Sequence, residues 1–163
     1  MANFTTFGLA TMLTLLVPGC ATFGASHDAN NFSEFLTRVD SAQVQLQQGV
    51  PEPYKSLWSH GEDITLAGGF GGHIEQGWAK VSKRLDWAGS NFVNGRNEIR
   101  RLAFAASGDV GYLVQTEHVM FKTPDALAAE RNYRVTMLFR RENGEWRIIH
   151  RHADSQTTKE APR

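Results

Sequence analysis

The sequence predicts an α+β domain in which helices come first and a long antiparallel sheet follows. Apolar residues recur at helical spacing between residues 31 and 50. From Ser90 onward the chain instead alternates apolar and polar residues, as strands do. Near its end, Glu142-Asn143-Gly144-Glu145 contains the Asn-Gly pair that a tight hairpin turn favours. With 163 residues, of which 41% are hydrophobic, the chain fits one globular domain with a substantial core.

The charge balance and the cysteine content exclude several classes of function. Lys and Arg together number 17, as do Asp and Glu, so no general attraction to nucleic acid or to an anionic membrane is expected. Cys20 is the single cysteine of the sequence. A disulfide within the chain and a cysteine metal cluster are therefore excluded.

The N-terminal segment is typical of an export signal. The first 26 residues contain no Asp, Glu, Lys or Arg, and Phe7 to Val17 form an apolar run too short to span a membrane. Val17-Pro18-Gly19-Cys20 resembles a bacterial lipoprotein processing site. We therefore expect residues 1–26 to be a leader, with a mature start near Cys20 or Ala25 and a periplasmic or lipid-anchored protein. An uncleaved cytoplasmic extension is the alternative.

A polar tether over residues 21–30 is expected to lead into the first helix. Asn31 is predicted to cap that helix, with Glu34 completing a capping box. Gly49-Val50-Pro51 is predicted to end it. The side chains at helical spacing, which we expect to be buried, are Phe32, Phe35, Leu36, Val39 and Leu46.

The middle of the chain predicts short elements, a glycine run and a second helix. Tyr54 to Ser59 is expected to form a helical turn, and Asp63 to Leu66 a short strand. Gly68 to Gly72 has neither the GxGxxG spacing nor the Walker ending of a nucleotide-binding loop, so no cofactor is expected. Its glycines instead suit a sharp turn or a close approach of backbone at a pocket mouth. Apolar residues from Ile74 to Ala88 predict a second long helix.

Four long strands are predicted after this helix, the last two joined in a hairpin, and the final strand carries the candidate site. They cover roughly Phe92 to Ala106, Val110 to Lys122 and the hairpin from Arg131 to Ser155. Residues 156–163 form a polar tail. In the final strand, one predicted face carries Trp146, Ile148, His150, His152 and Asp154. An apolar pair followed by His-x-His-x-Asp indicates a strand that starts in the core and ends in a cavity.

Two motifs, LWSHGEDITLAGGFGG and GEWRIIHRHADS, resemble the SnoaL-like branch of the nuclear transport factor 2-like superfamily over residues 31–155. The resemblance implies a cone of curled antiparallel sheet wrapped against N-terminal helices. It also implies a small-molecule pocket between the long helix and the concave sheet, and homodimers through the outer face of the sheet. The superfamily includes isomerases, polyketide cyclases, dehydratases, epoxide hydrolases and proteins that only bind or assemble, so the fold does not settle the function.

Individual family roles transfer only in part. The place of the steroid-isomerase catalytic aspartate matches Gly68, so the resemblance does not supply that catalytic group. The ending His150-x-His152-x-x-Ser155 also resembles the association domain of calcium/calmodulin-dependent kinase II and, more loosely, the iota-class carbonic anhydrases. The catalytic candidates are His150, His152, Asp154 and Asp63. The ligand-binding candidates are Trp58, His60, Phe70, Trp78 and Arg134.

Three functions remain open for these residues. In an acid/base enzyme acting on a small, largely apolar substrate, a histidine would transfer a proton. In a protein that only binds, Arg134 and the histidines would hold a carboxylate or phenolate. In a metal site, His150 and His152 would need a third ligand, for which His118 and Glu117 are the candidates. Alternatively, both histidines only form hydrogen bonds within the sheet.

Overall fold

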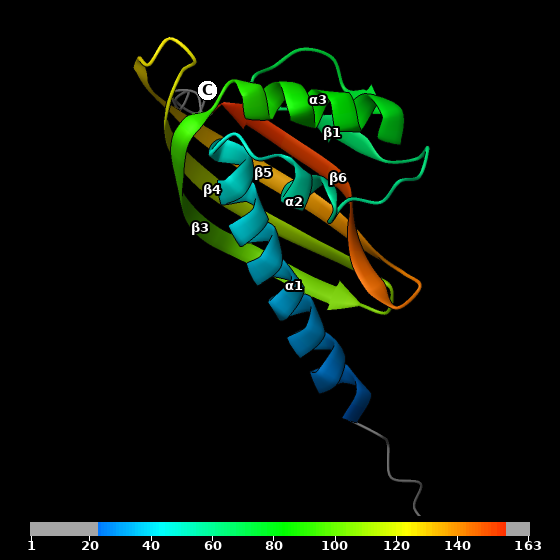
Figure 1. Ribbon diagram of the computed structural model, residues 1–163. Coiled ribbons are helices and arrows are strands. Elements are labelled where there is room, and N and C mark those ends of the chain that lie inside the picture. The colour runs from blue at the N-terminus through cyan, green and yellow to red at the C-terminus, as the bar shows by residue number, and fades with distance from the viewer. Residues whose placement is uncertain (1–22, 156–163) are drawn as a thin grey trace, which may run out of the picture.

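The computed structural model describes residues 23–155 and the side chains of residues 31–155. Its elements are α1 (Phe23–Gln47), α2 (Glu52–Lys55), β1 (Thr65–Ala67), β2 (Glu75–Gln76), α3 (Trp78–Ser90), β3 (Val93–Ser107), β4 (Val110–Lys122), β5 (Ala128–Glu142) and β6 (Glu145–Ser155). The six strands form one open sheet in the order β2-β1-β6-β5-β4-β3. Figure 1 shows the helices together on one side of the curved sheet, with α1 crossing the long strands. The predicted α+β class is confirmed.

Helix α1 packs its predicted apolar face on the sheet. All five residues expected to be buried are buried, and the ring of Phe32 lies 4.8 Å from that of Trp146 and 5.4 Å from that of Phe139. The predicted start at Asn31 is wrong, because the helix already begins at Phe23. The capping-box pattern is equally compatible with a helix interior, and no proline interrupts residues 23–30.

The long strands form a meander of antiparallel neighbours, as predicted. The turn between β5 and β6 has positive φ angles at Asn143 (52°) and Gly144 (83°), the conformation that favours this residue pair. Residues of β4 alternate between buried and more exposed positions along the whole strand. Its inward-facing residues are Leu113, Gln115, Glu117, Val119 and Phe121.

The short strands extend the sheet on the far side of β6. Strand β1 pairs with β6 in parallel, and β2 pairs with β1 in antiparallel orientation. Trp58 forms an isolated bridge with Ile148, which anchors the segment after α2 on the same strand. This arrangement places the glycine segment that follows Ala67 beside the carboxyl end of β6.

A β-bulge in β6 changes which residues face the helices. Phe139 pairs with Ile148 and Leu138 pairs with His150, so Ile149 is an extra residue in the ladder. Because side chains alternate with a period of two, one extra residue exchanges the two faces of the strand beyond it. The residues before and after Ile149 that share the inward face are Trp146, Ile148, Arg151 and Ala153.

The predicted leader lies almost entirely outside the described residues. Cys20 and the apolar run from Phe7 to Val17 belong to residues 1–22, and the polar tail to residues 156–163. Residues 23–30, for which a polar tether was predicted, are helical. Among the helices of residues 23–155, none is both long and apolar enough to cross a membrane.

The contact between α1 and β3 generates a stability prediction. A Cβ atom added at Gly95 would overlap the backbone oxygen of Gln47 and lie 2.6 Å from its Cβ. We therefore expect Gly95→Ala to destabilise the protein by about 1–3 kcal/mol in urea unfolding, as overpacking does. The exposed Ala103→Ser change in the same strand should stay within about 0.5 kcal/mol. Equal unfolding midpoints for the two variants would mean that α1 does not pack this closely on β3.

Candidate ligand-binding site

A pocket lies between the helices and the concave face of the sheet. It encloses a cavity of about 60 Å³. Its polar lining side chains, buried or nearly so, are Gln43, Gln47, Tyr54, Glu117, Tyr133 and Arg151. The partly exposed Gly68, Gly69, Phe70, Arg84 and Ala88 mark its opening, and the buried Leu46, Leu66, Leu85 and Phe92 complete the lining. Apolar and aromatic residues combined with a few polar groups are the usual lining of a small-molecule site.

A buried ion pair forms the floor of the pocket. The two terminal nitrogens of Arg151 donate to the two carboxylate oxygens of Glu117 at 3.0 and 2.9 Å. The side chain of Glu117 is 0% exposed and that of Arg151 is 11% exposed. The guanidinium reaches Glu117 across β5, where it passes 3.8 Å from the sulfur of Met137. This two-pronged geometry is the strongest form of an Arg–carboxylate contact.

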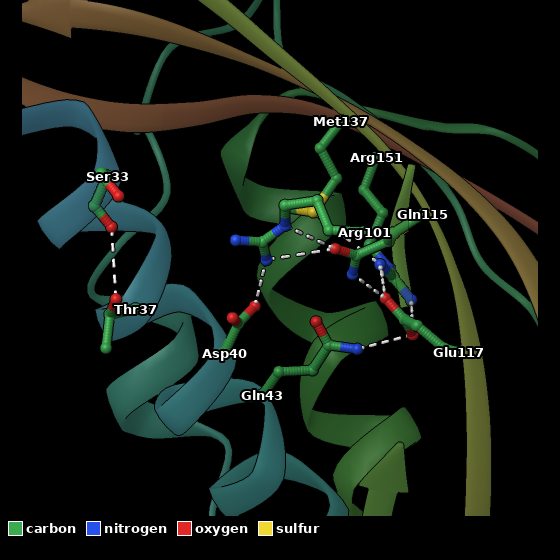
Figure 2. Close-up of polar contacts among 9 residues, drawn as sticks. All are labelled: Ser33, Thr37, Asp40, Gln43, Arg101, Gln115, Glu117, Met137 and Arg151. Carbon is green, nitrogen blue, oxygen red and sulfur yellow. Dashed lines mark hydrogen bonds and ion pairs between the residues drawn. The ribbon is translucent and has the colours of Figure 1, made fainter. Parts of the chain in front are cut away.

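Further hydrogen bonds extend the ion pair toward α1 (Figure 2). Nε2 of Gln43 donates to Glu117 at 2.6 Å, and Nε2 of Gln115 donates to it at 2.7 Å. Arg101 on β3 then donates to Oε1 of Gln115 at 3.2 Å and to Oδ1 of Asp40 at 2.7 Å. The network therefore joins α1 to three strands through side chains alone.

Both members of the ion pair are charged. Burial by itself raises the pKa of Glu117, but the charge of Arg151 and the hydrogen bonds from Arg151, Gln115 and Gln43 outweigh it and hold the pKa below its ordinary value. Burial likewise opposes the charge on Arg151, and the carboxylate of Glu117 reverses this effect, so the pKa of Arg151 is raised. The floor thus carries one positive and one negative charge and is neutral as a unit.

Two tyrosine hydroxyls face the same buried region without a partner. Within the described part of the chain, the hydroxyls of Tyr54 and Tyr133 have no hydrogen-bond partner, nor do the amide oxygens of Gln43 and Gln47. Burial raises the pKa of Tyr54 to about 12, and it also raises the pKa of Tyr133. Both phenols are therefore protonated at neutral pH and available as donors. Buried polar atoms rarely lack partners, and these four are the unsatisfied hydrogen-bonding groups of the pocket lining.

The predicted position of His150 and His152 in the pocket is wrong. Beyond the bulge at Ile149 both side chains lie on the outer face of the sheet, beside Thr136 and Leu138 on β5. His150 Nδ1 shares a hydrogen bond of 2.7 Å with Oγ1 of Thr65. Partial burial, with a smaller effect of His152, lowers the pKa of His150. The pocket lining contains no histidine among the described residues.

The carboxylates predicted as catalytic are also outside the pocket. Asp154 accepts two hydrogen bonds from Arg134 at 2.6 and 3.1 Å on the outer face. Asp63 pairs with Arg140 at 2.6 Å, and this contact lowers the pKa of Asp63. Both carboxylates therefore have partners at the surface of the protein.

Of the predicted ligand-binding residues, Phe70 alone lines the cavity. Trp58 is part of the core, with 1% of its surface exposed. His60 stacks on Trp78 at 4.0 Å, away from the pocket. Arg134 belongs to the outer-face ion pair. The cavity lies between the helices and the concave sheet, where the resemblance implied a pocket, but Phe70 is the one expected residue that lines it.

The metal alternative finds no support in the geometry. His118 lies on the outer face between Glu98 and Glu130, with nitrogen–oxygen distances of 3.6 and 3.1 Å, whereas Glu117 points inward. Between residues 23 and 155, no three His, Cys, Asp or Glu side chains are grouped so that they could hold a metal ion.

Sequence reasoning missed Arg151 and considered Glu117 only as a possible metal ligand, although one signal for a buried ion pair was present. Glu117 shares a strand face with Leu113, Val119 and Phe121, and a charged residue in such company calls for a buried partner. Arg151 was assigned to the outer face because strict alternation takes no account of a bulge. The missing information was thus the pairing of β6, not the chemistry of its residues.

The sequence comparison identifies a family. A sequence model described as a SnoaL-like domain matches residues 46–156, which is more than half of the chain and includes Glu117 and Arg151. A search of curated proteins finds no match.

Solved structures support the same fold. A nuclear transport factor 2-like superfamily protein from Salmonella enterica is similar with a TM-score of 0.70 and 16% identity, covering 83% of this chain and 95% of that one. A protein from Streptomyces avermitilis, provisionally named a dehydratase of the NTF2-like family, has a TM-score of 0.69 and 17% identity, covering 82% of this chain and 99% of that one. A provisionally named calcium/calmodulin-dependent kinase II association domain from Thiobacillus denitrificans has a TM-score of 0.63 and 15% identity, covering 77% of this chain and 94% of that one. At these identities the similarity concerns the fold.

The ion pair predicts an unusual mutational pattern. Arg151→Met should cost about 3–5 kcal/mol in urea unfolding at pH 7, because it leaves the Glu117 carboxylate buried without its counter-charge. Adding Glu117→Gln to Arg151→Met should recover part of this loss, because the uncompensated charge is removed while an amide remains for Gln43 and Gln115.

The wild type and Arg151→Met should differ in how the contribution of Glu117 to stability changes with pH. In the wild type the folded-state pKa of Glu117 lies below its unfolded value, so its stabilisation is lost as the pH falls from roughly 4.3 toward the folded pKa. In Arg151→Met burial dominates and raises that pKa, so lowering the pH from 7 should relieve part of the destabilisation. A variant whose loss of stability is the same at pH 7 and pH 5 would show that Glu117 is not held ionised by Arg151.

Proposed function

The chain belongs to the SnoaL-like family, and from this membership we propose that it binds a small uncharged molecule in the pocket between the helices and the concave sheet. The observation that carries the proposal is the combination of a neutral, internally paired floor with unpartnered tyrosine hydroxyls above it. The floor fixes the shape of the inner end, while the hydroxyls remain available to a ligand. Binding therefore uses groups that folding leaves unsatisfied.

The charge state of the floor supports an uncharged ligand. An anion would attract Arg151 away from Glu117, and a cation would do the reverse, so either would disturb a buried pair. A carbonyl or hydroxyl oxygen can instead accept from Tyr54 or Tyr133 without disturbing the pair. A ligand hydroxyl can also donate to the free amide oxygen of Gln43. The favoured ligand is thus neutral, oxygen-bearing and otherwise apolar.

Acid/base catalysis on such a molecule, of the isomerase, cyclase, dehydratase or hydrolase type, is the second candidate. It is favoured by the presence of a carboxylate and two phenols in one pocket, and a structural neighbour is provisionally named a dehydratase. A general base should have a pKa near the working pH, however, whereas Glu117 has a lowered pKa and is already hydrogen-bonded to three side chains. The pocket therefore supports binding more directly than proton abstraction.

Binding predicts a specific effect of Tyr54→Phe. A thermal-shift screen of small neutral alcohols, ketones and phenols should yield ligands, and Tyr54→Phe should weaken their binding about 3- to 10-fold through the loss of one hydrogen bond. The unfolding temperature of the free protein should hardly change, since the hydroxyl has no partner there. Tyr112→Phe on the outer face is the matched control and should bind normally. Unchanged affinity in Tyr54→Phe, with ligand still bound, would place the ligand elsewhere.

The outer face of the sheet supports a proposal of self-association. Tyr112 and Leu138 are cross-strand neighbours on this face and are 41% and 39% exposed. On either side of Tyr112 on the same face of β4, Val110 is exposed and Val114 is partly exposed. Contiguous apolar side chains on an open sheet face favour contact with another protein surface, and a second copy of the chain meets this need by symmetry.

The dimer proposal predicts the effect of a charge at Leu138. Sedimentation at micromolar concentration should show twice the chain mass of 18.2 kDa for the wild type. Leu138→Glu should shift the equilibrium toward monomer, because it would bury an unpaired charge in the interface. Leu127→Glu, at an exposed leucine in the loop before β5, is the control and should leave the dimer intact. A monomeric wild type would refute the proposal outright.

A further inference from the structure

The Gly68 to Gly72 segment covers the mouth of the pocket. At Gly69 an added Cβ atom would lie 2.5 Å from Cε1 of Tyr133, so the backbone rests directly on the tyrosine ring. Only glycine permits so close an approach. The segment therefore separates one of the two pocket tyrosines from the outside.

Phe70, at the centre of this segment, places its ring at the opening of the pocket. Its ring lies 5.1 Å from that of Phe92 and 5.4 Å from that of Trp87. The guanidinium carbon of Arg131 lies 5.7 Å from the centre of the ring. Phe70 is nevertheless only partly buried, although it lines the cavity. The segment thus places an aromatic ring among aromatic walls at the opening.

One exposed hydrogen bond holds the segment in place on its outer side. Nη2 of Arg84 on α3 donates to the carbonyl oxygen of Gly71 at 2.6 Å. The guanidinium also lies 4.2 Å from the ring of Trp87, which orients it. Gly71 and Gly72 have φ angles of 77° and 94° and no atoms within 4 Å of an added Cβ at Gly71. At Gly72 the nearest atom to an added Cβ is Nη2 of Arg84, at 3.8 Å, so on this side the outer half of the segment faces Arg84 and open space.

The cavity is too small for a ring while Phe70 is in place. Its volume is about 60 Å³, whereas an apolar cavity that binds benzene has roughly 150 Å³. The Phe70 ring lines the cavity and lies among the rings of Trp87, Phe92 and Phe121, so it takes up space that a ligand ring would need. A single-ring ligand can enter only if Phe70 leaves.

We propose that Phe70 is the gate and the size-determining residue of this pocket, and that its ring stands where the ring of a single-ring, uncharged, phenol-like ligand binds. When Arg84 releases Gly71, the glycine segment swings outward and carries Phe70 with it. The ligand ring then contacts Phe92, and its oxygen reaches the hydroxyls of Tyr54 and Tyr133. This inference rests on the proposed function and adds to it the ligand class and the route of entry.

The first test removes the gate. Phenol and benzene, both uncharged at pH 7, are titrated into the full chain and followed by NMR chemical shifts. Phe70→Ala should bind both at least about tenfold more tightly than the wild type, because no ring has to be displaced. Phe104→Ala removes an exposed aromatic ring outside the pocket and should leave both affinities unchanged.

The second test removes the hydrogen bond from Arg84 to Gly71 and keeps Phe70, so it remains informative even if Phe70→Ala does not fold. Arg84→Gln should bind phenol several-fold more tightly and associate faster, since the closed state loses its hydrogen bond to Gly71. Lys83→Gln alters an exposed neighbour on the same helix and should behave as the wild type.

The outcomes separate this inference from the proposed function. If Phe70→Ala and Arg84→Gln both bind the rings no more tightly than the wild type, Phe70 is not a gate, even where Tyr54→Phe weakens phenol binding. If Phe70→Ala binds both rings more tightly but Tyr54→Phe weakens neither, the gate stands and the polar recognition proposed above fails. Tyr54→Phe weakening phenol but not benzene, together with tighter binding in Phe70→Ala, supports both.

Discussion

The ion pair between Arg151 and Glu117 is the constraint on which the rest of the interior depends. Removing two charges from water costs several kcal/mol for each ion, and the pair is tolerable only because the remaining hydrogen-bonding capacity is also used. Gln43 from α1 and Gln115 from β4 donate further hydrogen bonds to the carboxylate of Glu117. Helix α1 can therefore occupy only positions in which the amide of Gln43 reaches Glu117. A purely apolar contact between α1 and the sheet would tolerate sliding, whereas this network fixes the position of the helix.

The β-bulge and the ion pair depend on each other. Without the extra residue Ile149, strict alternation would place His150 and His152 inside and Arg151 outside. Glu117 would then be buried with no cation, at a cost that no neighbouring amide could offset. The bulge therefore brings the counter-charge to the carboxylate, and the energy of the pair in turn stabilises a local irregularity that costs one unpaired position in the ladder.

The same bulge explains how far the sequence could predict the molecule. Helical spacing identified the buried face of α1, and Asn143-Gly144 identified the hairpin, because both signals are local. The strand faces beyond Ile149 could not be predicted, since pairing with β5 is a long-range property and a shift of one residue reverses every side chain. Of the expected site residues, Phe70 lies in the pocket. The local signal that pointed to it was the glycine run on either side, which indicated a close approach of backbone at a pocket mouth.

The division between a fixed floor and a movable mouth follows from these energetics. Any rearrangement of the floor would separate buried charges, so ligand binding must use the groups that the ion pair leaves unpaired, namely the tyrosine hydroxyls and the amide oxygen of Gln43, together with the apolar wall. The mouth, in contrast, is formed by a glycine segment, the partly buried ring of Phe70 and one exposed hydrogen bond, so its movement separates no buried charges. The inner end of the pocket thus selects ligands by charge and hydrogen bonding, and the glycine segment with Phe70 selects them by size. In a pocket of this kind, change in ligand preference is least costly at the mouth, because substitutions there leave the ion pair, the bulge and the position of α1 unaltered.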